Sequence, residues 1–131
     1  MSAKASLSFD IYLRAAPRQI RPVLADPALA PRSLVGIQFQ PGRDEDPQRL
    51  TCEWRQSDHL EANGGVASVV RFEFVAMGRV TRLRVTLRDL VSGGSFLDVV
   101  ASGWPVILSG LKSLIETGRP LEFSCPGPAA W

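Results

Sequence analysis

The chain has few residues of the kinds that metal binding and nucleophilic catalysis use most. It contains one histidine, His59, and two cysteines, Cys52 and Cys125, which lie far apart in the sequence. Zinc sites require clustered Cys and His ligands, and disulfide-stabilised domains require several cysteines at short spacings. We therefore expect no metal site, no cofactor and two reduced thiols. His59 lies in a polar turn and is interpreted as a surface residue.

Long hydrophobic runs are also missing. No apolar run approaches the roughly 20 residues that are needed to span a bilayer. Residues 1–17 lack the continuous apolar core of a secretory signal, because Ser8, Asp10 and Arg14 interrupt the hydrophobic residues. The sequence predicts a cytoplasmic protein without a membrane span.

Neither sign of charge dominates. Fifteen Lys and Arg stand against thirteen Asp and Glu, which gives a net charge of +2, and the basic residues form no run. Nucleic-acid binding depends on a clustered basic surface, so we expect no nucleic-acid partner. The consecutive acids Asp44, Glu45 and Asp46 are interpreted as a solvated loop rather than as a cation site.

The length and composition fit one domain over residues 1–131. Hydrophobic residues make up 45% and charged residues 21% of the chain, and this size can bury a core without disulfides or metals. Residues 121–131 are expected to form a tail, either disordered or folded over the rest of the domain.

The first elements are a strand and two short helices. Residues 7–14 alternate strictly between apolar and polar, which is typical of a half-buried strand. Pro17 suits a first helical turn, and a helix from there to Asp26 would contain Pro22 in its body. A second short helix is predicted near residues 27–32.

In four further segments apolar and polar residues again alternate, which is the pattern of a strand. Strands are predicted at 37–40 and 50–55, and a hairpin is predicted from 69–75 and 80–87, joined across Met77-Gly78-Arg79. The inner row of the hairpin is predicted to be Val70, Phe72, Phe74, Leu83, Val85 and Leu87, and the outer row Arg71, Glu73, Arg82, Arg84 and Thr86. The opposite charges of the outer row are expected to form ion pairs between the two strands, and an anion-binding surface is the alternative interpretation.

The long C-terminal helix is the most informative element. Its apolar residues keep steps of three and four across Pro105, so the helix is predicted to continue through the proline and to kink there, with Gly103 giving room for the bend. A helix that begins at Pro105 is the alternative. The predicted stripe is Val100, Trp104, Ile107, Leu108, Leu111, Leu114 and Ile115.

Together these elements indicate an α+β fold of the helix-grip type, in which a curved antiparallel sheet wraps around a long kinked C-terminal helix. Four segments carry a resemblance: AAPRQIRPVLADPAL (15–29), DPQRLTCEWR (46–55), VTRLRVTL (80–87) and GWPVILSGLKSLIETGRPL (103–121). On these segments the chain resembles the SRPBCC (START and birch-pollen-allergen-like) superfamily, in the branch named after the activator of the ninety-kilodalton heat-shock chaperone ATPase.

The resemblance implies a hydrophobic cavity between the long helix and the sheet, which accepts apolar molecules in many relatives. The chain also departs from the family pattern. It has Arg32-Ser33-Leu34 where an aromatic pair is usual, and only fifteen residues from Val35 to Arg49. A shortened sheet is therefore expected, with an open groove or an exposed edge that a second subunit could cover.

These observations favour a binding protein for a small apolar ligand, such as a lipid or an aromatic molecule. The inner rows contain no carboxylate or histidine, so we predict no catalytic residues. Cys52 faces inward and is interpreted as an inert small hydrophobe. The alternatives are a protein-interaction module that acts on a chaperone or forms a homodimer, and a cyclase or hydrolase that uses the same cavity. The predicted ligand-binding residues are Leu50, Trp54, Phe72, Phe74, Leu83, Val85, Trp104, Leu108 and Leu111.

Overall fold

The chain folds as an α+β domain, here in a computed structural model. The structure describes residues 4–25, 37–39, 48–54, 61, 63–91 and 96–119. The elements are β1 (Lys4–Leu13), α1 (Pro17–Ala25), β2 (Ile37–Phe39), β3 (Arg49–Trp54), β4 (Ser68–Met77), β5 (Val80–Val91) and α3 (Phe96–Thr117). This order confirms the predicted fold class. The predicted helix at 27–32, the loop acids at 44–46, His59 and the tail at 121–131 lie outside the described residues.

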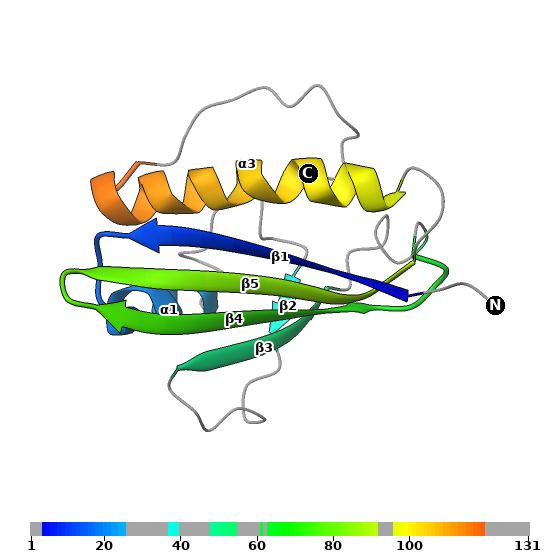
Figure 1. Cartoon of the computed structure of the whole chain (residues 1–131), viewed down its shortest axis with the longest axis horizontal. Helices are drawn as coiled ribbons and strands as arrows, with labels where there is room; N and C mark the ends of the chain where they lie inside the picture. The colour runs from blue at the N-terminus through cyan, green and yellow to red at the C-terminus, as the bar shows by residue number, and fades with distance from the viewer. Residues whose placement is uncertain are drawn as a thin grey trace.

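The strands form one antiparallel sheet in the order β1-β5-β4-β3-β2 (Figure 1). The first strand therefore pairs with the last one. β2 is only three residues long and pairs with β3, in line with the expected shortening of the sheet.

The β4–β5 hairpin matches the prediction closely. Phe72 pairs with Val85, and the inner rows of both strands are buried. The turn is tighter than predicted, because Met77 is the last residue of β4 and pairs with Val80. Gly78 has a φ of 71°, which suits the first central position of a two-residue hairpin turn.

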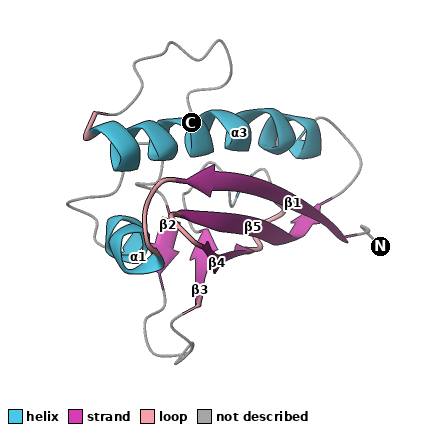
Figure 2. Ribbon diagram, turned by 60° about the vertical axis from the view of Figure 1, so that its left-hand side comes forward, coloured by secondary structure: helices cyan, strands magenta, loops and turns pink. Residues whose placement is uncertain are grey.

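The long helix α3 covers one face of the sheet (Figures 1 and 2). Two glycines are among the buried residues of α3. The buried residues are Val100, Gly103, Trp104, Ile107, Leu108, Gly110 and Leu111. Leu114 and Ile115, the last residues of the predicted stripe, are only partly buried.

Pro105 lies inside α3, on its exposed side. The helix begins nine residues earlier, at Phe96, so the alternative of a helix that starts at Pro105 is wrong. Proline lacks the N–H that would donate to the carbonyl of Ala101. The apolar residues on both sides of Pro105 pack on the same sheet, and this packing stabilises the helix through the defect.

By length and composition, α3 could also cross a membrane, whereas the sequence predicts no membrane span. Its apolar window has a mean hydropathy of 1.2, and 39% of that window is buried inside the domain. Core helices of soluble proteins meet the same criterion, and here the most apolar side of α3 packs against the sheet.

The first helix, α1, also packs on the inner side of the sheet. Ile20 and Leu24 are fully buried in the common core, and α1 contacts both α3 and β4. Pro22 lies inside the helix, as predicted. Arg21 Nη1 donates to the carbonyl of Arg49 at 2.5 Å and ties the helix to the start of β3.

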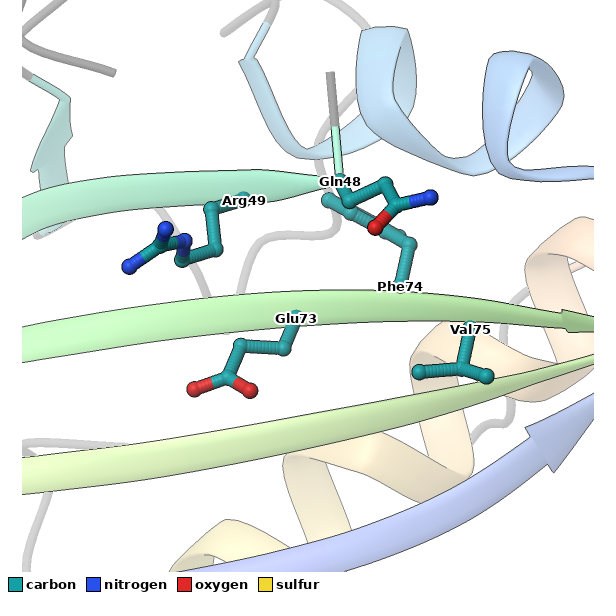
Figure 3. Close-up of a pocket in the computed structure, with 5 residues that line it drawn as sticks. All are labelled: Gln48, Arg49, Glu73, Phe74 and Val75. Carbon is teal, nitrogen blue, oxygen red and sulfur yellow. The ribbon is translucent and has the colours of Figure 1, made fainter. Parts of the chain in front are cut away.

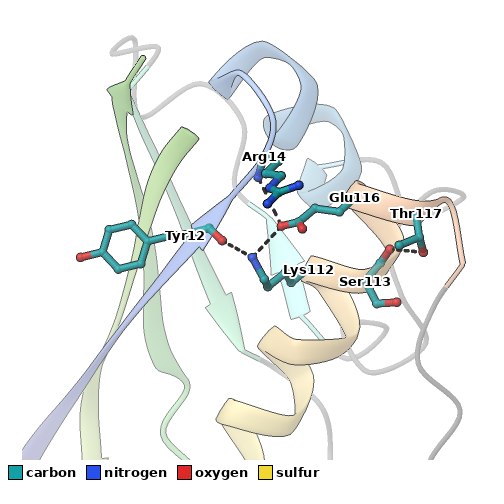
Figure 4. Close-up of polar contacts among 6 residues, drawn as sticks. All are labelled: Tyr12, Arg14, Lys112, Ser113, Glu116 and Thr117. Atoms are coloured by element: carbon teal, nitrogen blue, oxygen red, sulfur yellow. Dashed lines mark hydrogen bonds and ion pairs between the residues drawn. The ribbon is translucent and has the colours of Figure 1, made fainter. Parts of the chain in front are cut away.

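A polar cluster joins the end of β1 to α3 (Figure 4). Lys112 Nζ donates to the carbonyl of Tyr12 and pairs with Glu116 Oε2 at 2.6 Å, and the N–H of Arg14 donates to the same carboxylate at 3.3 Å. The last residue of α3, Thr117, donates to the carbonyl of Ser113 at 2.7 Å. These contacts fix the position of the helix C-terminus relative to the sheet.

Asn63 is a buried polar residue that holds the turn before β4 against the end of β5. Its Nδ2 donates to the carbonyls of Val66 and Asp89 at 2.7 and 2.9 Å, and its Oδ1 accepts from the N–H of Val91 at 2.8 Å. Asp89 has a φ of 62°, an unusual conformation for a residue with a side chain. Asn63 therefore satisfies backbone groups where β5 is irregular.

Candidate ligand site

The residues predicted to bind a ligand come together in the structure. They lie on β3, β4, β5 and α3, their exposed fractions are 0–5%, and all belong to one hydrophobic cluster. The members of the predicted site are Leu50, Trp54, Phe72, Phe74, Leu83, Val85, Trp104, Leu108 and Leu111. β1, at the opposite edge of the sheet from β3, adds Leu13 to the cluster, and Leu7, Phe9 and Ile11 pack against it.

Two tryptophans of this cluster contact each other. The rings of Trp54, at the end of β3, and Trp104, on the buried side of α3, have their centroids 5.6 Å apart and an interplanar angle of 84°. This edge-to-face arrangement is favourable for aromatic pairs and contributes about 0.5–1.5 kcal/mol beyond area burial. The pair connects the helix to the half of the sheet that is farther from β1.

The indole N–H of Trp104 has no hydrogen-bond partner among the residues that the structure describes. Trp104 is fully buried, and its Nε1 makes no hydrogen bond in the structure. A buried donor without an acceptor costs about 1–3 kcal/mol, and buried tryptophans usually find a partner. Trp104 therefore offers one unused donor inside an apolar environment.

The thiol of Cys52 belongs to the same cluster but is not activated. It is buried and donates to the carbonyl of Val70, with a sulfur–oxygen distance of 3.3 Å. Burial raises the pKa of the Cys52 thiol well above its ordinary value. The thiolate is the nucleophilic form, so Cys52 is a poor nucleophile here, in agreement with its interpretation as a small hydrophobe.

The buried polar side chains of the described part of the chain are Asn63, Ser68 and Thr81. Asn63 bonds backbone groups, and Thr81 Oγ1 donates to the carbonyl of Ala15 at 2.6 Å. Both residues thus have structural partners. Within the described ranges, no group of three or more His, Cys, Asp or Glu residues could hold a metal ion.

A pocket of about 280 Å³ lies elsewhere, at the start of β3 beside β4 (Figure 3). Its lining residues are Gln48, Arg49, Glu73, Phe74 and Val75. Of these only Phe74 belongs to the predicted ligand site. Arg49 and Glu73 are cross-strand neighbours, and their charged side chains make this a polar surface feature rather than an apolar cavity.

The sequence predicts the apolar residues that come together here, but it does not predict that the described residues leave the indole N–H of Trp104 without a partner. The predicted bend of the C-terminal helix places Trp104 in the lining, whereas the state of its N–H depends on which acceptors the fold brings near. The available signal was the absence of polar residues from the inner rows, because a tryptophan among only apolar neighbours has few acceptors within reach.

Comparison with known proteins supports the assignment of the fold. Residues 43–116, more than half of the chain, match the family model described as Activator of Hsp90 ATPase homolog 1-like protein. No curated protein matches the chain.

Solved structures share the fold at low sequence identity. CalU16 from Micromonospora echinospora is 18% identical with a TM-score of 0.66, and the match covers 92% of this chain and 86% of that one. An HSP90 activator from Plasmodium falciparum is 16% identical with a TM-score of 0.67, over 88% of this chain and 97% of that one. An Aha1 dimer from Colwellia psychrerythraea is 15% identical with a TM-score of 0.62, over 87% and 98%. The chain belongs to the family of Activator of Hsp90 ATPase homolog 1-like proteins, within the SRPBCC fold.

Proposed function

We propose that the protein binds a small, mainly apolar molecule between α3 and the inner face of the sheet, and that Trp104 Nε1 donates a hydrogen bond to an oxygen of this ligand. The observation that carries the proposal is the unpartnered indole N–H in a fully apolar cluster. A ligand with one acceptor would satisfy this donor, and the rest of its surface would be covered by hydrophobic side chains.

The lining chemistry defines the ligand class. The side chains around Trp104 are aliphatic or aromatic, with a buried thiol at Cys52. A charged ligand would lose its hydration without finding a counter-ion among these residues. A neutral aromatic or lipid-like ketone, ester or alcohol fits better than an acid or an amine.

The proposal can be tested with a pair of probes that differ in one acceptor. 2-Acetonaphthone and 2-ethylnaphthalene have similar apolar bodies, and only the ketone accepts a hydrogen bond. Titration followed by tryptophan fluorescence should show that the ketone binds more tightly by about tenfold, which corresponds to about 1.4 kcal/mol for one buried hydrogen bond. Trp104→Phe should bind both probes equally. Absence of saturable binding of either probe would refute the proposal.

Native mass spectrometry of freshly purified protein gives an independent test. A retained mass with a neutral oxygen function would support the proposal and identify a ligand directly.

The proposed location is the cytoplasm, where a free thiol such as that of Cys52 remains reduced.

A second candidate function is the regulation of a chaperone ATPase. The family description favours it, as does the structural similarity to an HSP90 activator. The test is to measure the ATPase rate of the host's Hsp90-type chaperone with and without this protein. No change in rate and no co-sedimentation of the two proteins would exclude it.

A further inference from the structure

The outer face of the sheet, on the side away from α3, carries a row of four alternating charges. The row crosses four strands, and its members are Asp10 of β1, Arg84 of β5, Glu73 of β4 and Arg49 of β3. Asp10 pairs in register with Arg84, Arg84 with Glu73, and Glu73 with Arg49. We call these four residues the charge row.

The side chains of the charge row remain accessible to solvent. Arg84 Nε and Nη2 donate to the two carboxylate oxygens of Asp10 at 2.8 and 3.1 Å, yet the side chains keep 41% and 35% of their surface exposed. Glu73 is partly buried and Arg49 is exposed. A guanidinium has five donors and a carboxylate has about four acceptor positions, so each group can bond a second partner.

The order of charges makes this row self-complementary. Read from β1 to β3 the signs are negative, positive, negative, positive, and read in reverse they are the opposite at every position. Consider two copies stacked with their outer faces together. A two-fold axis that runs parallel to the strands, between β4 and β5 and midway between the two sheets, places the charge row of one copy opposite the reversed row of the other. Asp10 would then face Arg49 of a second copy, and Arg84 would face Glu73.

We propose that the outer face of the sheet is a homodimer interface, in which two charge rows meet with opposite signs across this two-fold axis. An isologous interface needs a surface that complements itself, and the charge row meets this requirement. The proposal is independent of ligand binding, because it uses the face of the sheet that is turned away from α3.

The neighbouring rows are compatible with the same axis. In one of them Arg82 lies between Tyr12 and Val75, so Arg82 of one copy would face Val75 of the other. Tyr12 and Val75 are 50% and 40% exposed and add apolar surface. In the row on the other side of the charge row, Arg71 lies between Thr86 and Thr51 and would face Thr86. No like charges meet in these rows.

The size of the face predicts a weak dimer. Four strands at a spacing of about 4.8 Å and about ten residues of about 3.4 Å each give roughly 600 Å² per subunit. Standard interfaces bury about 800 Å² per partner. We therefore expect dissociation at low protein concentration, and weaker association at high salt because the charge row is solvent-accessible.

Two single charge reversals provide the test. In Glu73→Arg, two arginines would meet at each central position of the dimer, and in Arg84→Glu two carboxylates would meet there. Each variant alone should therefore dimerise more weakly than the unaltered protein. An equimolar mixture of the two variants restores opposite charges at all four positions and should form a heterodimer.

Sedimentation velocity over protein concentrations up to about 1 mM, at low and high salt, measures these states. The unaltered protein should approach twice its mass of 14.3 kDa at low salt, each single variant should dimerise at least tenfold more weakly, and the mixture should recover the dimer. Asp98→Lys and Arg18→Glu are matched controls, since they change the net charge equally at exposed positions on the helices. They should leave the dimer unchanged.

Three results would overturn the proposal: an unaltered protein that stays monomeric at low salt, single variants that dimerise like it, or a mixture that stays monomeric. Circular dichroism of each variant verifies its fold. The double variant Glu73→Arg/Arg84→Glu keeps the row self-complementary and should dimerise by itself, which keeps the test valid if one single variant is unstable.

Discussion

Trp54 and Trp104 meet edge to face in the core, with ring centroids 5.6 Å apart. One ring belongs to the sheet and the other to the closing helix, so the pair links the two layers of the fold. The same contact places the free N–H of Trp104 in the apolar cluster.

Trp104→Ala should therefore destabilise the protein strongly. Removal of a fully buried tryptophan costs about 3–5 kcal/mol in free energy of unfolding, whereas Trp104→Phe should cost less because most of the apolar contact remains. Urea denaturation followed by circular dichroism measures both values. A cost below about 1 kcal/mol for the alanine variant would show that the helix does not depend on this contact.

Asn63→Leu should destabilise the protein through lost hydrogen bonds rather than through a cavity. The leucine would leave the carbonyls of Val66 and Asp89 and the N–H of Val91 without their present partner. Unsatisfied buried groups cost about 1–3 kcal/mol each, and these three groups are only partly buried, so we expect a total loss of at least about 2 kcal/mol. Hydrogen exchange should become faster at Val91, and an unchanged rate there would contradict the assigned role.

The stability of the protein should fall in acid through two carboxylates. The hydrogen bond from Arg84 lowers the pKa of Asp10, and the hydrogen bond from Lys112 lowers the pKa of Glu116. A lowered folded-state pKa stabilises the fold above the ordinary pKa, and this stabilisation is lost as the pH falls from the ordinary value through the folded value. The relevant window therefore begins at the ordinary values of 3.8 and 4.5 and extends downward.

Thermal unfolding across this pH range checks the direction. Asp10→Asn and Glu116→Gln should each flatten the acid limb of the stability curve. Asp98→Asn is a suitable control, since Asp98 is exposed in the first turn of α3. Equal flattening by the control would contradict the assignment.

Cys52 should not react with a disulfide reagent in the folded protein. Its thiol is buried and hydrogen-bonded to the carbonyl of Val70, so the reactive thiolate is both rare and inaccessible. In a Cys125→Ser background, Ellman's reagent should release no colour from the native protein and one equivalent in urea. Rapid reaction without denaturant would show that this part of the core opens readily.

Much of the fold follows from periodicity. The alternation in β4 and β5 predicts the buried rows that contain Phe72 and Val85, whereas their register is set by a turn that is tighter than predicted. The apolar stripe of α3 predicts continuity through Pro105, because burial on both sides outweighs one missing hydrogen bond. Such local patterns are carried by neighbouring residues and need no knowledge of the topology.

The pairing of β1 with β5 could not be predicted in the same way. Asp10 and Arg84 lie 74 positions apart, and only the strand order brings them together. The ion pairs are likewise predicted within the hairpin, between β4 and β5. In the structure Arg84 of β5 instead bonds Asp10 of β1 rather than Glu73 of β4. The free N–H of Trp104 depends on tertiary packing for the same reason.

The proposed role of Trp104 can be observed directly by NMR. In a protein labelled with nitrogen-15, addition of 2-acetonaphthone should move the indole N–H signal of Trp104 downfield in a saturable manner, because a hydrogen bond deshields the proton, while 2-ethylnaphthalene should not produce this shift. An indole signal of Trp104 that stays in place at saturating ketone would contradict the proposal that Trp104 donates a hydrogen bond to a bound ligand.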